Sequence, residues 1–410
     1  MRILFFSHYF PPEGNAPASR TFAHCRRWVA AGHEVTVVTS APNHPRGVLY
    51  PGYRNRIRQV EDWDGVRVVR VVTFLAANAG TWRRSLNYLS YMVSAAILGS
   101  LERRPDVVLA TSPQFFCGWA GVLVSRIRRI PFVLEIRDLW PESIAAVGAI
   151  RSRMAIGLLA KLELAMYRSA RQIVTVGEGY RQRLLERGAD GTRLAVVMNG
   201  VDGELFSPRD QDEHLAEGVG VAGRFVVAYC GVIGMAHGLE VVLRAASHLR
   251  ERPDGRQVVF LLVGDGARLD DLKAMAERDG LDNVVFTGNV AKACVPGLIA
   301  LSDVCLVHLR ASDTFTTVMP SKIFEAAAMA KPVILGVRGF AAEFVRTAGC
   351  GLCIEPENER ALVDAVLRLS ADRSLCERLG RAGRDHVVRH YSRDELARDY
   401  LDVIERTATA

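Results

Sequence analysis

The sequence lacks the marks of membrane-spanning, disordered and nucleic-acid-binding proteins. No apolar run approaches the ~18 residues of a spanning helix, and the N-terminal stretch MRILFFSHYF has no signal-peptide cleavage pattern. No tract is of low complexity, and the net charge of +7 arises from arginines scattered without a block of like charges. We therefore expect a globular protein of the cytoplasm, free or peripheral at the inner face of the cytoplasmic membrane, with no nucleic acid as a partner.

Patterns for binding metals are also scarce. The single C-x-x-C, formed by Cys350 and Cys353, has neither a second pair nor a nearby histidine to complete a zinc site. Two ordinary thiols in a strand explain it, and a reducing compartment suits them. No D-x-D follows a predicted strand, because Asp270 and Asp271 fall on a predicted helix. The sequence predicts a protein that needs no metal ion or other cofactor.

Short apolar runs alternate with helical patterns along the chain, which is typical of parallel sheets built from βαβ units. In the first half the predicted strands cover residues 2–8, 34–40, 66–72, 106–112, 132–138, 172–177 and 194–200. In the second half they cover residues 224–231, 257–264, 283–289, 304–309 and 332–337. Residues 202–224, rich in polar residues, proline and glycine, interrupt the alternation and indicate a linker.

A chain of 410 residues is longer than one hydrophobic core usually supports. We predict the α/β class, with two doubly wound Rossmann-like domains facing a central cleft. The predicted domains are residues 1–203 and 204–390, and a C-terminal helix within 391–410 is expected to pack back on the first domain. Ligands of such sheets bind beyond the carboxyl ends of the strands, so the loops after the strands should hold the site residues.

The stretch YCGVIGMAHGLE places Gly231, Gly234 and Gly238 in the loop that follows a predicted strand. Glycine lets the backbone approach a phosphate closely, and the following helix start favours negative charge. His237 would add a hydrogen bond or partial positive charge. We predict a loop that faces a phosphate, with a plain turn as the alternative.

A second glycine-rich turn, VGDGARL, contains Gly264, Asp265 and Gly266. It does not satisfy the dinucleotide fingerprint G-x-G-x-x-G, because position 269 is leucine. A tight turn and a ligand packed against exposed backbone explain these glycines equally well.

The stretch PSKIFEAAAMAK predicts a helix that begins near Ser321. Serine is a good N-cap, but Lys322 in the first turn opposes the usual preference for acidic residues there. An anion bound at the helix start would explain the lysine. Glu325 lies one turn further on the same face, where its carboxylate could accept two hydrogen bonds from a ribose diol. The alternative is a solvated glutamate paired with a neighbouring lysine.

In the first half, the loop HYFPPEGNAPASR (8–20) is longer than a connection from strand to helix needs, and such loops are often functional. Its prolines stiffen it, Gly14 followed by Asn15 bends it, and Arg20 directs a cation toward the helix start. The loop after the second strand, PNHPRG (42–47), offers His44, although its composition leaves the role open.

The strand FVLEIRD ends in Arg137 and Asp138. Asp138 could orient a hydroxyl group of a ligand, or it could hold the following turn, as aspartate commonly does.

Two predicted helices, 81–100 and 151–172, carry basic and aromatic residues together. Such helices can lie on an anionic membrane surface, or they can be core helices with a solvated basic face.

Several motifs follow one another in a familiar order. They are FSHYFPPEGNAPASR, WVAAGHEVTVVT, EIRDLWPES, MNGVDGELFSP, YCGVIGMAHGLE, VGDGARLDDL, VVFTGNV and PSKIFEAAAMAKPVI. Through them the chain resembles, along essentially its whole length, the retaining glycosyltransferases of family 4, which have the two-domain GT-B fold. Through HYFPPE, PNHP, DLWPES and PSK-x-F-E it is most similar to bacterial transferases of lipopolysaccharide O-antigen, capsule and exopolysaccharide biosynthesis, including the UDP-N-acetylfucosamine transferase group.

The resemblance implies transfer of a hexosyl or N-acetylhexosaminyl group from a UDP-sugar to a saccharide or polyprenyl-diphosphate-linked acceptor. The anomeric configuration is retained, and no metal is expected. Such enzymes are thought to use front-face attack, in which backbone amides and cations stabilise the departing diphosphate.

The resemblance also implies where the substrates bind. Glu325 matches the glutamate that binds the donor ribose in the C-terminal domain. The implied donor residues are Gly234, His237, Gly264, Asp265, Gly266, Val290, Pro320, Ser321, Lys322 and Glu325. The implied acceptor side comprises Gly14, Asn15, Arg20 and His44, and the expected catalytic residues are Arg137, Asp138, Lys322 and Glu325.

The chain departs from the family pattern at three places. Many members have a second glutamate where this chain has Thr317, and an Arg–Lys clamp where it has Val232 and His237. Arg137 stands where many members carry a histidine. Lys322 is therefore our first candidate for the missing positive charge.

Two rival functions remain from the sequence. A nonhydrolysing UDP-sugar 2-epimerase also has two such domains around a UDP-sugar. A catalytically silent nucleotide-sugar binding protein would explain the missing glutamate at position 317.

Overall fold

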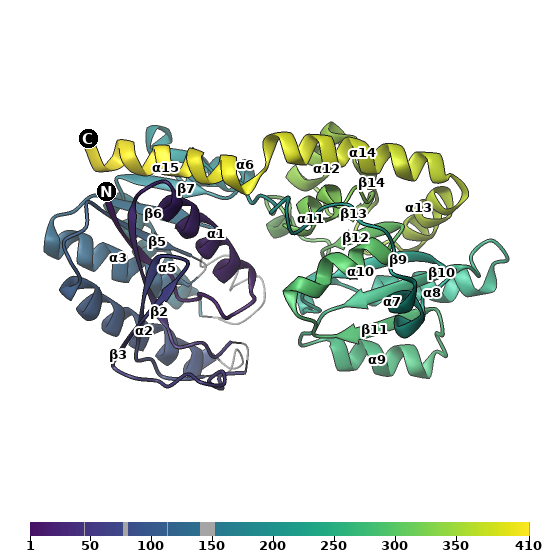
Figure 1. Cartoon of the computed structure of the whole chain (residues 1–410), viewed down its shortest axis with the longest axis horizontal. Coiled ribbons are helices and arrows are strands. Elements are labelled where there is room, and N and C mark those ends of the chain that lie inside the picture. Colours follow the sequence, from purple (N-terminus) through teal and green to yellow (C-terminus); the bar gives the residue numbers. More distant parts are fainter. Residues whose placement is uncertain (45, 77–80, 113, 140–151, 410) are drawn as a thin grey trace. The chain divides into compact units, whose positions relative to one another are not determined.

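The structure is a computed structural model that describes residues 1–410 except 45, 77–80, 113, 140–151 and 410 (Figure 1). The described chain divides into two compact units. Unit 1 contains residues 1–198 and 393–410, and unit 2 contains residues 199–392.

Unit 1 contains an eight-stranded sheet with the strand order β3-β4-β2-β1-β5-β6-β7-β8. The strands are β1 (Arg2–Phe6), β2 (Glu34–Ser40), β3 (Arg58–Trp63), β4 (Val66–Val71), β5 (Val107–Thr111), β6 (Phe132–Ile136), β7 (Gln172–Thr175) and β8 (Leu194–Val196). All neighbours are parallel except β3 and β4. The sequence analysis missed β3, because this edge strand buries little apolar surface and its residues alternate between exposed and half-buried.

Alternate residues of the unit 1 strands face two different helical layers. Phe5 belongs to a buried cluster with Trp28 of α1 (Ala16–Ala30) and Tyr400 of α15 (Arg393–Thr409). Phe6, on the opposite face, lies against Gly99 of α2 (Thr81–Leu101). The second layer consists of α2 (Thr81–Leu101), α3 (Phe115–Arg128) and α5 (Arg153–Ser169). Among the described residues, the remaining α-helix of this unit is α6 (Glu178–Glu186), which packs against β7 and β8.

The last helix, α15, lies in unit 1 and packs along α1 (Figure 1). The indole Nε1 of Trp28 donates to the carbonyl of Ala397 over 3.0 Å, and Arg27 forms an ion pair with Asp394. Tyr400 and Ile404 complete the contact with the sheet, since both are fully buried.

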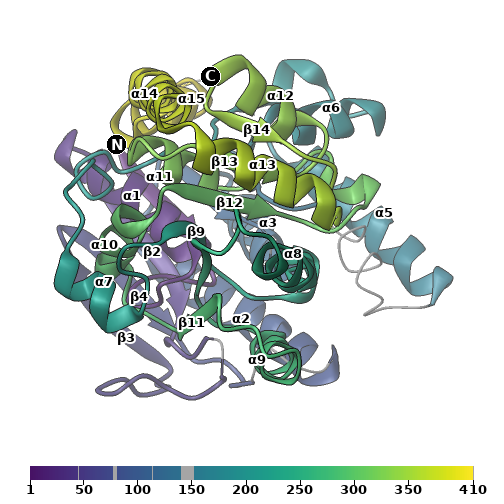
Figure 2. The same cartoon turned by 90° about the vertical axis from the view of Figure 1, so that its right-hand side faces the viewer.

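Unit 2 contains a parallel six-stranded sheet with the order β11-β10-β9-β12-β13-β14. The strands are β9 (Phe225–Cys230), β10 (Val258–Val263), β11 (Val284–Gly288), β12 (Val304–His308), β13 (Val333–Gly336) and β14 (Gly351–Cys353). The helices α8 (Glu240–Glu251), α9 (Leu269–Arg278) and α13 (Glu359–Ala371) cover one face, and α8 lies beside α9 (Figure 2). On the other face pack α7 (Glu213–Val219) and α10 (Val295–Leu301). The remaining helices are α11 (Lys322–Ala328), α12 (Phe340–Ala348) and α14 (Arg373–His390).

All twelve strands predicted from the sequence are present, whereas the predicted linker is not entirely irregular. It contains α7, which begins where the carboxylate of Asp212 accepts a hydrogen bond from the backbone N–H of Leu215 over 3.0 Å. Leu215 then packs against the core of unit 2.

Within the described residues, no helix is long and apolar enough to span a bilayer. The same part of the chain brings no three His, Cys, Asp or Glu side chains into an arrangement that could hold a metal ion. Cys350 and Cys353 are both free thiols.

Candidate active site

Backbone hydrogen bonds join the loops after β9, β10 and β11 to one another. The N–H of Ile233 donates to the carbonyl of Asp265 over 2.9 Å, and the N–H of Gly264 donates to the carbonyl of Gly288 over 3.0 Å. A Cβ on Gly264 would lie 1.9 Å from the carbonyl oxygen of Gly231. Glycine is therefore required at position 264 by the packing of two loops.

In the turn Gly264–Asp265–Gly266, a close backbone contact requires glycine at position 266 as well. Gly266 has φ +158°, and a Cβ there would lie 2.4 Å from the carbonyl oxygen of Ile233. Asp265 is exposed, and its carboxylate accepts a hydrogen bond from the N–H of Gly266 over 2.7 Å. Chain packing thus explains both glycines, the first of the two alternatives left open above.

Lys322 points from the start of α11 toward the end of β9. Its ammonium donates to the hydroxyl of Tyr229 over 2.6 Å and lies 4.1 Å from the centre of that ring. The Tyr229 hydroxyl donates in turn to the carbonyl of Val232 over 2.6 Å. Gly231, with φ +140°, leaves room for the lysine, because a Cβ there would lie 2.3 Å from Lys322 Cε. Burial lowers the pKa of Lys322 to about 8.

The start of α11 differs from the prediction in one respect. Ser321 precedes the first helical residue, but its own backbone is helical (φ −60°, ψ −24°) and its side chain makes no capping hydrogen bond. Lys322 is the first residue of this seven-residue helix and carries a positive charge at its start. Pro320 contributes only a carbonyl, which accepts from the N–H of Ile323 over 3.2 Å.

Glu325 lies in the first turn of α11 and is half-buried. It is close enough to Lys322 for its charge to oppose the lowering of the lysine pKa. At the position of the missing second glutamate, the hydroxyl of Thr317 donates to the carbonyl of Thr314 over 3.5 Å. Val290, after β11, is half-buried and packs against the core of unit 2.

His237 does not supply the positive charge considered from the sequence. Its Nδ1 accepts a hydrogen bond from the N–H of Gly234 over 3.4 Å, and burial lowers its pKa to about 3. The ring is therefore neutral near pH 7, and it meets Tyr229 edge to face with 5.9 Å between ring centres.

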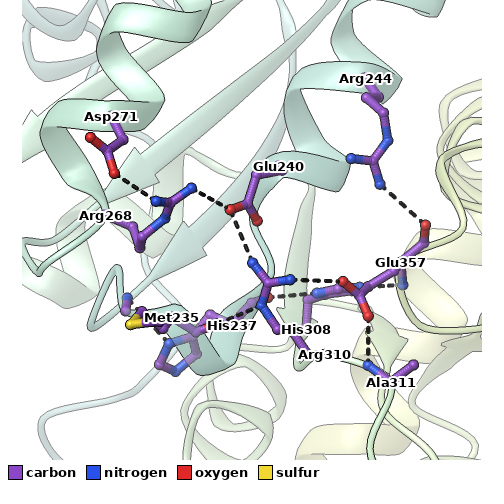
Figure 3. Close-up of polar contacts among 11 residues, drawn as sticks. Met235, His237, Glu240, Arg244, Arg268, Asp271, His308, Arg310, Ala311 and Glu357 are labelled. Atoms are coloured by element: carbon purple, nitrogen blue, oxygen red, sulfur yellow. Dashed lines mark hydrogen bonds and ion pairs between the residues drawn. The ribbon is translucent and has the colours of Figure 1, made fainter. Parts of the chain in front are cut away.

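His308, at the end of β12, is a residue that the sequence analysis missed (Figure 3). Its Nδ1 donates to the carbonyl of His237 over 2.7 Å, and its Nε2 accepts from the N–H of Glu357 over 2.9 Å. These two partners fix a neutral tautomer and join the loops after β9 and β14. The signal available in the sequence was a histidine at the carboxyl end of a buried strand.

A network of ion pairs surrounds these loops (Figure 3). Glu240 accepts from Arg268 over 2.8 Å and from Arg310 over 3.1 Å. Arg310 also donates to the carbonyl of Met235 over 2.7 Å and pairs with Glu357 over 3.3 Å. Both arginines thus have carboxylate partners near the loop where family members carry their clamp.

In unit 1, Glu13 joins the loops after β1 and β2. Its Oε1 accepts from the N–H groups of Asn43 and His44, each over 3.0 Å. Burial is the main influence on this carboxyl group and raises its pKa to about 7. Gly14 beside it is exposed, and a Cβ there would meet nothing within 4 Å.

Asn15 and His44 are both fixed by neighbours. The side-chain oxygen of Asn15 caps α1 by accepting from the N–H of Ala18 over 2.9 Å. His44 meets Tyr9 edge to face with 5.2 Å between ring centres, and burial lowers its pKa.

His8, at the end of β1, is a second residue without an assigned role in the sequence analysis. Its ring is surrounded edge to face by Tyr9, Tyr88 and Tyr91 at 4.8, 5.5 and 4.7 Å between ring centres. Burial lowers its pKa to about 3, and its Nδ1 finds no hydrogen-bond partner in the described part of the chain.

Arg20, which was expected on the acceptor side, lies buried inside unit 1. It is buried and forms an ion pair with Glu135 over 2.9 Å. Its guanidinium also donates to the carbonyls of Val197 and Met198 over 2.8 and 2.7 Å. This corrects the prediction, because these partners enclose the cation, which joins α1 to β6 and to residues 197–198 after β8.

Arg137 and Asp138 lie after β6 and are half-buried. The N–H of Arg137 donates to the hydroxyl of Ser112 over 2.8 Å, and its guanidinium donates to the carbonyl of Pro17 over 3.4 Å. Burial lowers the pKa of Arg137 to about 10, which leaves it charged. The motif residues 140–143 that follow lie outside the described residues.

The structure therefore gathers the predicted residues into two groups. The donor-side residues lie at the carboxyl ends of β9, β10 and β11 and at the start of α11, all in unit 2. The acceptor-side residues Gly14, Asn15 and His44, together with Arg137 and Asp138, follow strands of unit 1.

Comparison with known proteins assigns a class to this arrangement. Residues 15–200 match the family model described as a glycosyl transferase 4-like domain, and residues 210–386 match the model described as glycosyl transferases group 1. Together these two domains account for most of both units.

Curated relatives are transferases as well. WcaI of Escherichia coli K12, a glycosyl transferase named for colanic acid biosynthesis, is 24% identical over 423 residues, covering 98% of this chain and 100% of WcaI. A GDP-mannose-dependent phosphatidylinositol monomannoside mannosyltransferase of Mycobacterium tuberculosis is 30% identical over 237 residues, which is 57% of this chain and 61% of the relative.

Solved structures show the same fold. Sucrose-phosphate synthase of Thermosynechococcus elongatus superposes with a TM-score of 0.78 at 19% identity, covering 99% of this chain and 98% of that chain. HepE of Anabaena, solved in complex with UDP, has a TM-score of 0.71 at 19% identity and covers 99% and 100% of the two chains. The chain is thus a glycosyltransferase of the GT-B fold, and its class is that of the family 4 enzymes.

Proposed function

We propose that this glycosyltransferase moves a sugar from a UDP-sugar to a saccharide or polyprenyl-diphosphate-linked acceptor in surface polysaccharide synthesis, with retention of configuration. The observation that carries the proposal is the position of Lys322. Its ammonium is held by Tyr229 beside the loops that follow β9 and β10, where a GT-B enzyme presents its nucleotide sugar.

The proposed donor site follows from the chemistry of these groups. Lys322 would neutralise charge on the departing diphosphate, and Glu325 would accept from the ribose hydroxyls. His237 is neutral, so it can orient a hydroxyl or phosphate oxygen but cannot replace the missing clamp. Arg268 and Arg310 are already paired with carboxylates, which leaves Lys322 as the better candidate.

On the acceptor side, we propose that unit 1 receives the acceptor near Gly14, Asn15, His44 and Asp138. Gly14 is open, whereas Glu13 fixes the loops on either side of it. Arg137 remains charged after burial, and we propose it as a catalytic cation of unit 1. The proposed donor carries a hexosyl or N-acetylhexosaminyl group, the two kinds of sugar that the resemblance to bacterial polysaccharide transferases implies. Metal independence is part of the proposal, since cationic side chains would serve in place of a metal ion.

A panel of UDP-sugars, incubated with the protein with and without lipid-linked saccharide acceptors and read by mass spectrometry, tests this function. Transfer of sugar to an acceptor, unchanged by a chelator, is the expected result. Epimerised UDP-sugar formed without acceptor would identify a 2-epimerase, and tight UDP binding without turnover would identify a silent binding protein. Either outcome would overturn the proposal. Turnover that stops in chelator and returns with added metal would overturn metal independence.

A further inference from the structure

The turn formed by residues 235–237, in the loop after β9, is held by residues at the end of β12. The Nε of Arg310 donates to the carbonyl of Met235 over 2.7 Å, and the N–H of Arg310 donates to the carbonyl of Ala236 over 2.9 Å. The Nδ1 of His308 donates to the carbonyl of His237 over 2.7 Å (Figure 3). Every carbonyl of the turn is therefore bound by His308 or by Arg310.

Glu357, in the loop after β14, holds both of these residues (Figure 3). Its N–H donates to the Nε2 of His308 over 2.9 Å, and one of its carboxylate oxygens accepts from the guanidinium of Arg310 over 3.3 Å. The other carboxylate oxygen accepts from the N–H of Ala311 over 2.9 Å, which fixes the chain just after Arg310. The backbone and the side chain of one residue thus support the two residues that bind the turn.

Glu357 has a backbone conformation that glutamate rarely takes. Its φ is +60°, in the left-handed region that favours glycine. A residue stays in such a conformation only where its contacts determine it, and the contacts here are those to His308, Arg310 and Ala311. Glycine would suit this backbone better, so the loop does not need the carboxylate in order to take its shape.

Gly238, which follows the turn, packs directly against the same three side chains. Its φ is +57°, and a Cβ there would lie 3.0 Å from Cγ of Arg310 and 3.4 Å from Cε1 of His308. The Oε1 of Glu357 would lie 3.6 Å from that Cβ. His308 is buried, and a Cβ on Gly336 would lie 2.3 Å from its Cδ2. The close packing leaves little room for the turn to move while these side chains stay in place.

We propose that Glu357 is a positioning residue for the donor, which acts through His308 and Arg310 to keep the turn 235–237 in the conformation that receives the nucleotide sugar. The inference rests on the proposed function, because the donor is proposed to bind at this loop. A loop that is ordered before the donor arrives loses less conformational entropy on binding, so its order raises affinity. Glu357 itself need not contact the donor.

The variant Glu357→Gly separates positioning from stability. Glycine tolerates the left-handed backbone, so thermal unfolding should stay close to that of the wild type. Amide hydrogen exchange at residues 235–238 of the ligand-free protein should become faster, because the supports of the turn are loosened. UDP affinity, measured by isothermal titration, should fall by roughly three- to tenfold, the scale of one lost hydrogen bond.

Asp64→Gly is the matched control. Asp64 also has a left-handed backbone, with φ +51°, but it lies in the exposed turn between β3 and β4 of unit 1. This variant should change neither the exchange at residues 235–238 nor the affinity for UDP.

Arg310→Met tests the route by which Glu357 acts, since it removes the side-chain donor to the carbonyl of Met235. Adding Glu357→Gly to Arg310→Met should lower UDP affinity by less than Glu357→Gly does in the wild type. Fully additive losses would overturn the proposal.

Three other results would also overturn it: unchanged exchange at residues 235–238 in Glu357→Gly, wild-type UDP affinity in that variant, or a loss of affinity matched by a large loss of thermal stability. A wild-type protein that binds no UDP would instead contradict the UDP donor of the proposed function. The exchange measurement, which needs no ligand, would still decide whether Glu357 holds the turn.

Discussion

The ammonium of Lys322 lies 2.6 Å from the hydroxyl of Tyr229, and that hydroxyl is itself hydrogen-bonded to the carbonyl of Val232. This chain of contacts fixes a cation from α11 at the end of β9. In the family pattern the cations come from the loop after β9 itself, where this chain has Val232 and His237. Lys322 is the cation that we propose in place of the charge that this loop lacks.

Replacing Glu325 tests the ribose assignment. Glu325→Ala should weaken UDP binding by roughly 1–3 kcal/mol, because the ribose hydroxyls lose a half-buried, charged acceptor. Isothermal titration with UDP measures this effect. Glu343→Ala, at an exposed position of α12, is the control and should leave UDP affinity unchanged. Wild-type affinity in the Glu325→Ala variant would remove this residue from the donor site.

Arg20 is expected to act on stability. Arg20→Met leaves the Glu135 carboxylate buried without its ion-pair partner, so the free energy of unfolding should fall by roughly 3–5 kcal/mol. Denaturant unfolding measures the loss. Arg181→Met breaks an exposed pair with Glu178 and should cost less than about 1 kcal/mol. Equal small losses in both variants would show that the buried ion pair contributes no more to the free energy of unfolding than the exposed pair does.

Glu13 should make stability depend on pH. Burial raises its pKa from 4.5 to about 7, so the folded state binds more protons than the unfolded state between these values. The folded state is therefore more stable, relative to the unfolded state, at low pH than at high pH. This contribution of Glu13 to the free energy of unfolding is complete below pH 4.5 and is lost as pH rises through 7, by up to about 3 kcal/mol. Glu13→Gln keeps the acceptor for Asn43 and His44 but does not titrate. Its free energy of unfolding, relative to wild type, should therefore rise between pH 5 and 8, measured by denaturant titration. A constant difference would contradict the raised pKa.

The repeating strands were predictable because a buried parallel strand is a continuous apolar run. The edge strand β3 was missed because RQVEDW gives no such run, and α7 was missed because its seven residues lie in a polar, glycine-rich segment. In both cases tertiary contacts supply the order that local composition does not indicate.

For the site, the loops after the strands were predictable, but the contacts of single side chains were not. Sequence placed Arg20 near a helix start and could not reveal that Glu135, distant along the chain, neutralises it. Likewise, the glycines at 264 and 266 suggested a ligand as readily as a turn, until the backbone of residues 231–233 was found against them. His8 and His308 were overlooked because a histidine at a strand end acquires its role only through its neighbours.

The pH dependence of UDP affinity tests the central claim that Lys322 binds the donor diphosphate as an ammonium group. With a pKa of about 8, Lys322 loses its proton between pH 7 and 9, while Tyr229 and Cys230, whose pKa values are raised, stay neutral and His237 is neutral throughout. The diphosphate is fully ionised in this range, since its last pKa is about 6. Wild-type affinity, measured by isothermal titration, should fall by up to about tenfold from pH 7 to 9, because one proton is required. Affinity of Lys322→Met should be weaker at pH 7 and constant across the range. A wild-type affinity that does not change with pH, or a Lys322→Met variant that binds UDP as tightly as wild type, would contradict the claim.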